Sequence, residues 1–499
     1  MVSSSSSSPS EVKIISECFV KPKTLPEKWK ESYHLTATEH VLLPFQYIQK
    51  GLLFLKPSIP ESDDAILKQK DFMETWLLKL KDSLATTLFH FYPLAGRFST
   101  LETDNPRSHS VFVDCNNSPG AGFIYATSDL SVSDIVEPKY IPLVVQSFFD
   151  HHKAVNRDGH TTSLLSVKVT ELVDGVFIGM SMNHSIGDGS SFWQFFNSFS
   201  QIFNSHEETI DNNNKLFCLK NPPIFREVSG PIYSLPYSKP NESSSQGMES
   251  PPALKQRMFH FSSETLTSLK AKANQDCGTT EISSLQSLSA FMWRSITRAR
   301  KLPNDQETSC RLAVGIRSRM DPPLPVDLFG VYISVATTTT KTGNLLENEL
   351  GWAASKVHQV VTEQTSEKIS SALDRYLKLT PSDISVKRLF PPTLVHMGSS
   401  PRFNKYGCEF GMGKAVAARS GYCGKYDGKV SAYPGREGGG SIDLEVCLLP
   451  QFMKLWNQIK SSCPLLILFL FSRYKTKVVS CLCLFVLLLC FVRFPTAVV

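Results

Sequence analysis

A histidine and an aspartate, four positions apart, are the residues of this chain best placed to do chemistry. His184 and Asp188 lie within residues 183–189, directly after an apolar run at residues 176–182 that is typical of a buried strand. A strand that ends in a glycine-rich turn fixes the backbone while the loop admits a substrate. A neutral histidine in this place can act as a general base, taking a proton from an alcohol or amine that then attacks an activated carbonyl.

Two other interpretations of His184 stay open on the residues alone. In a serine-hydrolase triad the histidine would activate a serine, but the chain has no Gly-x-Ser-x-Gly elbow, and Ser185 is too close in sequence to be the obvious nucleophile. An isolated histidine at a strand end can also be a core residue whose ring is satisfied by the backbone. Gly187 and Gly189 disfavour a continued helix, so Asp188 need not share a face with His184.

Length and composition restrict the class of protein. With 499 residues the chain can form two domains whose cores need neither disulfides nor a metal. The net charge of +6 comes without a block of lysines and arginines, so we expect no nucleic-acid partner, and the mild basicity suits an anionic small molecule. The twelve cysteines lack Cys-x-x-Cys spacing, which argues against a disulfide framework or a zinc ribbon.

The N-terminal segment predicts no targeting to the secretory pathway. Residues 1–11 contain a run of serines without a basic or an apolar region, so we expect a disordered segment rather than a signal peptide. The expected location is therefore the cytoplasm, where thiols stay reduced, and the expected state is a monomer.

Hydrophobic periodicity predicts the elements that would position the histidine loop. In the first half of the chain these are strands at 12–20, 111–113, 164–169 and 176–182 and helices at 76–89 and 192–203. In the second half they are strands at 257–261, 311–316 and 332–339 and helices at 263–274, 283–299 and 345–365. A segment rich in proline, serine and asparagine at residues 215–255 predicts a crossover linker between two domains.

Several separated motifs resemble the plant BAHD superfamily of acyl-CoA-dependent acyltransferases, also called the HXXXD type. The family's His-x-x-x-Asp-Gly motif matches residues 184–189, and its Tyr-Pro-Leu-Ala-Gly-Arg segment matches residues 92–97. Residues 317–325 look like the family's segment ahead of a Phe-Gly turn, which stands here at residues 329–330. The motifs occur in the family's order, and the resemblance extends over residues 12–450.

The resemblance implies an α/β fold of two similar-sized domains, like chloramphenicol acetyltransferase, with mixed sheets, flanking helices and an active-site channel between them. We place the N-terminal domain, which carries the motif, at residues 12–214 and the C-terminal domain at 256–454. The implied activity is transfer of an acyl group from acyl-CoA to a hydroxyl or amine of a plant specialised or surface metabolite. His184 would be the general base, without a covalent enzyme intermediate. Acyl-CoA would be a co-substrate, and no permanently bound cofactor or metal is expected.

The resemblance also assigns supporting roles. Asp188, the second residue of the motif, would point away from the channel and pair with an arginine, for which Arg317 is the expected partner. The family's Asp-Phe-Gly-Trp-Gly segment stands here as Glu-Phe-Gly-Met-Gly at residues 409–413, so the acid and the tryptophan have changed. That segment is thought to be architectural, and we expect structural support of the site from four of its members: Glu409, Phe410, Gly411 and Gly413. Val331 replaces the asparagine that usually follows the Phe-Gly turn.

Three further groups of residues have simpler interpretations than a site. One acidic and histidine-rich stretch lacks fixed metal-ligand spacing, and its candidate ligands are Asp150, His151, His152, Asp158 and His160. Residues 438–440, three glycines, lack the sequence of a phosphate-binding loop and predict a hairpin turn. The aromatic residues at positions 192, 193, 195 and 196 have helical spacing and predict core packing.

The C-terminal segment, residues 455–499, does not fit the family pattern. It contains two apolar runs, 463–471 and 478–492, and the second would span about 22 Å as a helix, short of the ~30 Å hydrocarbon core of a bilayer. An aberrant transcript or read-through translation is our preferred explanation, and a membrane tail anchor is the alternative. The competing hypothesis on function follows from these departures: a catalytically weak, ligand-binding or lyase-like relative that its tail tethers to a membrane.

Overall fold

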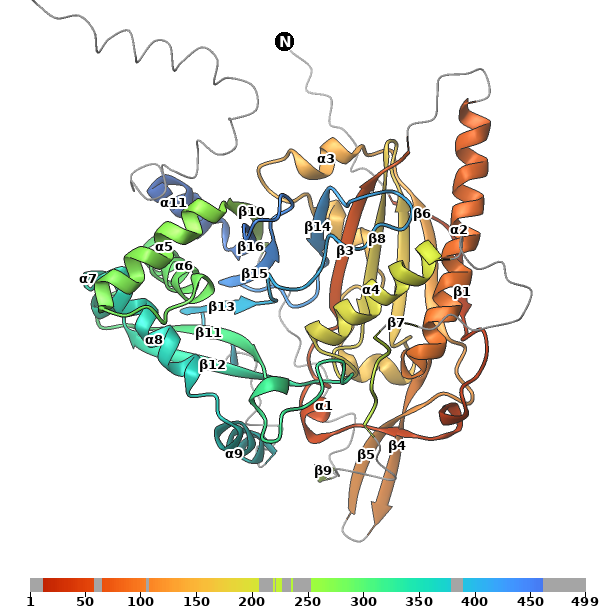
Figure 1. Cartoon of the computed structure of the whole chain (residues 1–499), viewed down its shortest axis with the longest axis horizontal. Coiled ribbons are helices and arrows are strands. Elements are labelled where there is room, and N and C mark those ends of the chain that lie inside the picture. The colour runs from red at the N-terminus through yellow and green to blue at the C-terminus, as the bar shows by residue number, and fades with distance from the viewer. Residues whose placement is uncertain are drawn as a thin grey trace, which may run out of the picture.

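Two mixed β-sheets of six strands each lie side by side and form the two halves of the molecule (Figure 1). The computed structural model describes residues 12–57, 65–104, 107–205, 219, 221–226, 235–236, 253–377 and 389–460. The predicted segment 1–11, most of the predicted linker 215–255 and the tail beyond residue 460 lie outside the described residues. The predicted fold class, α/β with two sheet-containing domains, is confirmed.

The first sheet has the strand order β1-β6-β7-β8-β3-β14. Its members are β1 (Lys13–Val20), β6 (Ala121–Thr127), β7 (Leu165–Glu171), β8 (Gly175–Met182), β3 (Ile48–Leu55) and β14 (Ala417–Ser420). The pair β6–β7 is parallel and the other pairs are antiparallel. The edge strand β14 comes from the second half of the chain, so the two halves share this sheet. The domain boundaries at residues 214 and 256 stay a prediction.

The second sheet has the order β10-β16-β15-β13-β11-β12. Its members are β10 (Lys255–Phe261), β16 (Ile442–Leu448), β15 (Lys429–Pro434), β13 (Leu394–Gly398), β11 (Glu307–Gly315) and β12 (Ile333–Lys341). A small third sheet is made of β2 (Tyr33–His34), β5 (Arg107–Asp114), β4 (Arg97–Asp104) and β9 (Leu235–Pro236).

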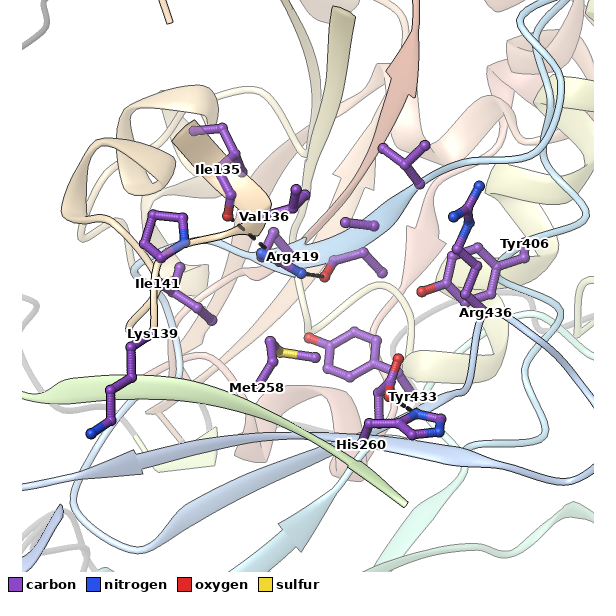
Figure 2. A pocket seen from close by; sticks show the side chains of 15 residues that line it. Ile135, Val136, Lys139, Ile141, Met258, His260, Tyr406, Arg419, Tyr433 and Arg436 are labelled. Atoms are coloured by element: carbon purple, nitrogen blue, oxygen red, sulfur yellow. Dashed lines mark hydrogen bonds and ion pairs between the residues drawn. The ribbon is translucent and has the colours of Figure 1, made fainter. Parts of the chain in front are cut away.

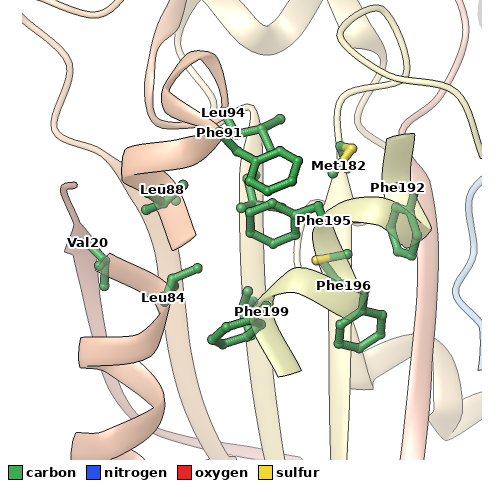
Figure 3. Packing of buried hydrophobic residues seen from close by; sticks show 14 of the residues in the cluster. Val20, Leu84, Leu88, Phe91, Leu94, Met182, Phe192, Phe195, Phe196 and Phe199 are labelled. Atoms are coloured by element: carbon green, nitrogen blue, oxygen red, sulfur yellow. The ribbon is translucent and has the colours of Figure 1, made fainter. Parts of the chain in front are cut away.

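Helices α2 (Ala65–His90) and α4 (Gly189–Ser205) cover one face of the first sheet. Their apolar side chains recur at helical spacing and are buried, as Figure 3 shows for Leu84 and Leu88 of α2 and for Phe195 and Phe199 of α4. The predicted aromatic core of residues 192–196 is therefore confirmed. The short helices α1 (Ala37–Val41) and α3 (Val132–Val136) lie at the two ends of this half.

The second sheet is apolar on one face only. Leu444, Val446 and Leu448 of β16 pack into a core that also contains residues of α5 (Ser263–Cys277), α6 (Ser284–Arg300), α8 (Leu350–Thr362) and α11 (Pro450–Lys460). Because successive side chains of a strand point to opposite faces, the intervening Asp443, Glu445 and Cys447 lie on the other face.

The predicted strands and helices are found, with shifted ends, except that the single helix expected at residues 345–365 is wrong. The segment forms two helices, α7 (Thr342–Glu347) and α8, followed by α9 (Ser366–Leu377). Asn348 and Glu349 are extended between α7 and α8, and the guanidinium of Arg294 donates hydrogen bonds to carbonyl oxygens at this break. Helical spacing of apolar residues cannot reveal a break that a distant arginine stabilises.

The predicted C-terminal tail begins inside a helix. Residues 455–460 belong to α11, and Trp456 in it is buried against Phe259 of β10, with ring centroids 4.5 Å apart. Among the described residues, no helix is both long and apolar enough to cross a membrane.

Candidate active site

His184 lies in the loop between β8 and α4, and backbone hydrogen bonds fix this loop. The sheet pattern continues one residue beyond β8, where the Asn183 N–H donates to the carbonyl oxygen of Leu164 at 2.8 Å. The Asn183 side chain then accepts a hydrogen bond from the Ser185 N–H at 3.0 Å. The histidine therefore leaves the sheet edge on a defined backbone.

Asn156, a residue that the sequence did not single out, holds the histidine itself. Its side-chain oxygen accepts a hydrogen bond from the His184 N–H at 2.7 Å, and its carbonyl oxygen accepts one from the Asn183 side chain at 2.7 Å. Asn156 is fully buried and also donates through its side-chain amide to the carbonyl oxygen of Leu42 at 2.7 Å. A lone asparagine within a polar stretch gave no sequence signal, since its partner is 28 residues away.

The surroundings of the His184 ring favour the neutral imidazole. Burial lowers the pKa of His184 below its ordinary value and outweighs the opposing effects of backbone carbonyl groups and of the Asp188 charge, while the charge of Lys429 adds to the lowering. Nδ1 is buried without a hydrogen-bond partner among the described residues, while the residue as a whole stays partly exposed. A neutral, partly accessible imidazole can accept a proton from a substrate. Ser185 is fully buried, and its Oγ makes no hydrogen bond to any described residue, so the geometry gives the triad interpretation no support.

Asp188 has the opposite environment and points to Arg317. The two side chains form a buried ion pair, with Nη1–Oδ2 at 2.7 Å and Nη2–Oδ1 at 3.3 Å. Asp188 Oδ1 also accepts from the Ser191 N–H at the start of α4, and Oδ2 accepts from the Tyr332 N–H, both at 3.0 Å. The carboxylate therefore caps α4 and ties it to the segment that leads into β12.

The same contact anchors the Phe-Gly turn. Arg317 donates to the carbonyl oxygen of Leu328 through Nε at 3.0 Å and through Nη2 at 2.9 Å, and the Asp188 N–H donates to that of Gly330 at 3.0 Å. Phe329 is fully buried, and its ring lies 5.5 Å from that of Phe91. Three hydrogen bonds, two from Arg317 to Asp188 and one from the Asp188 N–H to Gly330, thus join the motif to residues 317–330 of the second half.

Residues 409–413 pack against α4. Phe410 is fully buried, with its ring 5.0 Å from that of Phe199, and its carbonyl oxygen accepts a hydrogen bond from the Trp76 indole at 2.8 Å. Gly411 and Gly413 have φ angles of +72° and +71°, a backbone that favours glycine, whereas Glu409 is exposed. The segment packs α2 against α4, which explains how a methionine can stand at position 412.

The acidic and histidine-rich stretch is dispersed in the structure. Asp150 pairs with its neighbour His151 at 3.2 Å, whereas Asp158 accepts a hydrogen bond from the Val155 N–H at 2.9 Å and His160 contacts Thr100 at 2.9 Å. No three His, Cys, Asp or Glu residues in the described part of the chain could hold a metal ion together. Residues 438–440 form the predicted turn between β15 and β16.

A cavity of about 190 Å³ lies between the two halves, and residues of β14 form part of its lining. Figure 2 shows Arg419 on one side of it and Met258, His260 and Tyr433 of the second sheet on the other. His184 does not line this cavity. The cavity does show that the polar face of the second sheet borders the space between the halves.

Comparison with known proteins agrees with the motifs and the fold. The model of the Transferase family matches residues 10–462. An uncharacterised acetyltransferase of Arabidopsis thaliana is 35% identical over 453 residues, which cover 89% of this chain and 96% of the relative. The chain belongs to the BAHD acyltransferase family. A second BAHD relative, shikimate O-hydroxycinnamoyltransferase of Nicotiana tabacum, is 28% identical over 392 residues, covering 76% of this chain and 86% of the relative.

A solved structure has the same fold as this BAHD protein. TRI101 of F. sporotrichioides, crystallised with coenzyme A and T-2, superposes with a TM-score of 0.65 at 16% identity and covers 85% of this chain and 97% of that chain. At this identity the likeness concerns the fold alone.

Proposed function

We propose that the protein transfers an acyl group from an acyl-CoA thioester to a hydroxyl or amine of a plant specialised or surface metabolite, with His184 as the general base. The observation that carries the proposal is the contrast within one motif. His184 is neutral, partly exposed and fixed through its backbone N–H to Asn156, whereas Asp188 is fully buried and engaged with Arg317. Family membership supplies the reaction class.

The reaction needs one base and no covalent enzyme intermediate. The imidazole of His184 takes the proton from an acceptor O–H as its oxygen attacks the thioester carbonyl, or from an amine nitrogen once its lone pair has attacked, and a tetrahedral oxyanion forms. When the oxyanion collapses, the C–S bond breaks and coenzyme A leaves as a thiolate. The thiolate then receives from the imidazolium the proton that came from the acceptor. A thiol of pKa about 8.5 is a good leaving group, so positioning of the two substrates supplies much of the remaining rate enhancement.

Asp188 supports this site as a structural residue. Its carboxylate is saturated by Arg317 and by two backbone N–H groups, and it caps the helix that follows the histidine loop. We also propose that the enzyme works as a cytoplasmic monomer and takes acyl-CoA as a co-substrate, without a resident cofactor.

Thiol release with a panel of donors and acceptors tests the proposal. The donors are acetyl-CoA and a hydroxycinnamoyl-CoA, which the names of the two relatives suggest, together with succinyl-CoA and butyryl-CoA. The acceptors are shikimate and anthranilate, an alcohol and an amine, together with their methyl esters and pooled plant alcohols. We expect release that requires an acceptor and is lost in His184→Ala. Acceptor-independent thiol release, or a folded His184→Ala variant of undiminished rate, would contradict the proposal.

A further inference from the structure

The face of the second sheet that is turned away from its helices carries an unusual set of polar residues. In the register of β15 with β16, Lys429 lies opposite Cys447, Ser431 opposite Glu445, and Tyr433 opposite Asp443. On the other side of β15, Lys429 pairs with His396 of β13. Since residues two apart on a strand share a face, the lysine and the histidine lie on the same side as Glu445. The mechanism above uses none of these groups.

Glu445 is the buried carboxylate of this face, and it is already saturated. Lys425 forms an ion pair with it at 2.8 Å, the Ser420 hydroxyl donates to both of its oxygens, and the Tyr433 hydroxyl donates to Oε2 at 2.9 Å. Burial disfavours its charged form, but Lys425 and Lys50 outweigh this and hold the pKa of Glu445 at about 2. One lysine therefore neutralises this carboxylate.

Besides the fully buried Lys405, which donates to the carbonyl oxygen of Ala432 at 2.8 Å, two further lysines form no ion pair with a carboxylate of the described residues. Lys50 of β3 donates a hydrogen bond to the Tyr433 hydroxyl at 2.9 Å, and the Lys429 ammonium lies 5.8 Å from the centroid of the Tyr426 ring. Among the described residues, neither lysine forms an ion pair, and Lys429 Nζ makes no hydrogen bond. Both lysines are half-buried, and a half-buried cation without a carboxylate partner is costly, which marks the pair as a candidate ligand site.

Both lysines have a lowered pKa, which reflects the electrostatic cost of their charged forms. Burial lowers the pKa of Lys429 to about 7, and the charge of Lys50 adds to the shift. Burial likewise lowers the pKa of Lys50 to about 8, with Glu445 opposing and Lys425 adding to the effect. Burial lowers the pKa of His396 as well, and the charges of Lys429 and Arg311 add to this shift. An anion placed between them would relieve this repulsion.

Position links the lysines to the active site. Lys50 lies opposite Met180 in the β3–β8 register, and Met180 precedes His184 by four residues. The charge of Lys429 lowers the pKa of His184. Gly398 of β13 makes room for the ammonium, because a Cβ atom there would lie 2.3 Å from Lys429 Nζ. The glycine thus allows the Lys429 ammonium to lie over β13.

We propose that Lys429 and Lys50 form an anion subsite next to His184 that binds a carboxylate of a substrate. This inference rests on the proposed function and narrows its substrate class. The carboxylate can belong to the acceptor or to the acyl group of the thioester, as in a dicarboxylic acyl-CoA. A guanidinium or ammonium that meets a carboxylate forms a strong, charge-assisted contact, so the subsite would select charged over neutral substrates.

Kinetics with matched substrate pairs test the subsite and its source. We compare wild type, Lys429→Met and the surface control Lys341→Met on shikimate and anthranilate against their methyl esters, and on succinyl-CoA against butyryl-CoA. Loss of about 10- to 100-fold in kcat/KM for the charged acceptors alone would place the acceptor carboxylate at Lys429, and the same loss for succinyl-CoA alone would place the acyl carboxylate there. Equal losses for charged and neutral partners, or no preference in wild type, would overturn the proposal.

A second variant moves the charge without removing it. Gly398→Ala places a methyl group against the flexible end of Lys429, so it should displace the ammonium while the sheet still folds. We expect Gly398→Ala to reduce the same charged-substrate preference as Lys429→Met, with an unchanged circular dichroism spectrum. A folded Gly398→Ala protein with the full wild-type preference would count against the assigned position.

A readout without turnover separates this inference from the proposed function. Trace labelling of amines with acetic anhydride, followed by mass spectrometry, reports the accessibility of Lys429 in the full chain of His184→Ala. We expect malonate to protect Lys429 and malonamide not to, with Lys341 unaffected by either. Protection of Lys429 in this variant, together with no detectable acyl transfer by wild type, would leave the anion subsite standing while the proposed function fails. Equal labelling of Lys429 with and without malonate would overturn the subsite.

Discussion

At the scale of single residues, the two members of the His-x-x-x-Asp motif have different tasks because their surroundings differ. His184 has a lowered pKa from burial and a buried Nδ1 without a partner, so the ring stays neutral and available. Asp188 is fully buried but has a charged partner and two N–H donors, so its carboxylate is held in place and cannot turn towards a substrate. The proposed general base and the structural carboxylate thus lie four positions apart in the sequence.

The lowered pKa of His184 predicts the acid side of the pH profile. The proposed mechanism needs the base form of His184, which is lost only when the pH falls through the pKa of the folded protein, and this pKa lies below the ordinary value of 6.5. We therefore expect kcat/KM, measured with an uncharged acceptor, to stay flat from neutral pH to below 6.5 before it declines. An acidic limb with its midpoint at or above 6.5 would contradict this account.

Removal of the buried carboxylate should cost stability before it costs chemistry. Asp188→Asn leaves the Arg317 guanidinium buried and unpaired, and such a change lowers the free energy of unfolding by about 3–5 kcal/mol. Urea denaturation measures the loss, and Arg317→Met combined with Asp188→Asn should cost less than the sum of the single changes. Additive losses in the double variant would show that the two side chains do not depend on each other.

At the scale of elements, α4 connects the motif to the rest of the core. Asp188 caps the first turn of α4, and the aromatic side chains of α4 pack on α2 and the first sheet. Phe410 of the segment 409–413 also packs against α4. This segment keeps its phenylalanine and glycines, the residues that packing and positive φ angles demand, and it has changed the acid and the tryptophan. Of the two changed residues, Glu409 is exposed and Met412 packs at the edge of the core.

Two single substitutions in this segment should have very different effects. Phe410→Ala removes a fully buried ring from a cluster of aromatic side chains, and we expect a loss of about 3–5 kcal/mol in the free energy of unfolding. Glu409→Ala changes an exposed side chain and should stay within about 0.5 kcal/mol of wild type. Chemical denaturation of both variants checks this, and comparable losses would refute the architectural role of the ring.

The elements also show which parts of the site the sequence could reveal. Strand β8 and helix α4 follow from periodicity, and the motif between them marks the loop, so local patterns suffice for His184. Asn156 and Lys429 reach the site only through tertiary contacts, from a polar loop and from a strand more than 200 residues away. The paired Asp188 and Arg317 were accessible only through the family resemblance, because nothing in the spacing of the two residues indicates their contact.

At the scale of the whole molecule, the polar face of the second sheet borders the space between the two halves. The second sheet buries its apolar face under its helices and turns its polar face, with Tyr433 and Met258, towards the cavity beside β14 (Figure 2). Strand β14 and the Asp188–Arg317 pair join the halves at separate points. The alternation of apolar and polar residues in β16 could have predicted this polar face. The sequence could not show that β14 of the first sheet lies across the cavity from it.

The C-terminal helix belongs to this architecture, and truncation tests it. Trp456 and Met453 of α11 are buried against the second core, so a chain that ends after residue 460 should keep the full fold, whereas one that ends after residue 449 loses both side chains. We expect the shorter chain to have a Tm lower by about 5 °C or more. Equal Tm values for the two truncations would show that α11 does not stabilise the second half.

The measurement that tests the central claim most directly is the acceptor-dependent rate of coenzyme A release by wild type, His184→Ala and the matched control His160→Ala, an exposed histidine of the same half. General-base catalysis contributes about 10²–10⁴-fold, so the rate should fall by that factor in His184→Ala alone, with an unchanged unfolding midpoint. If folded His184→Ala releases coenzyme A as fast as His160→Ala, His184 is not the base and the account of this site is wrong.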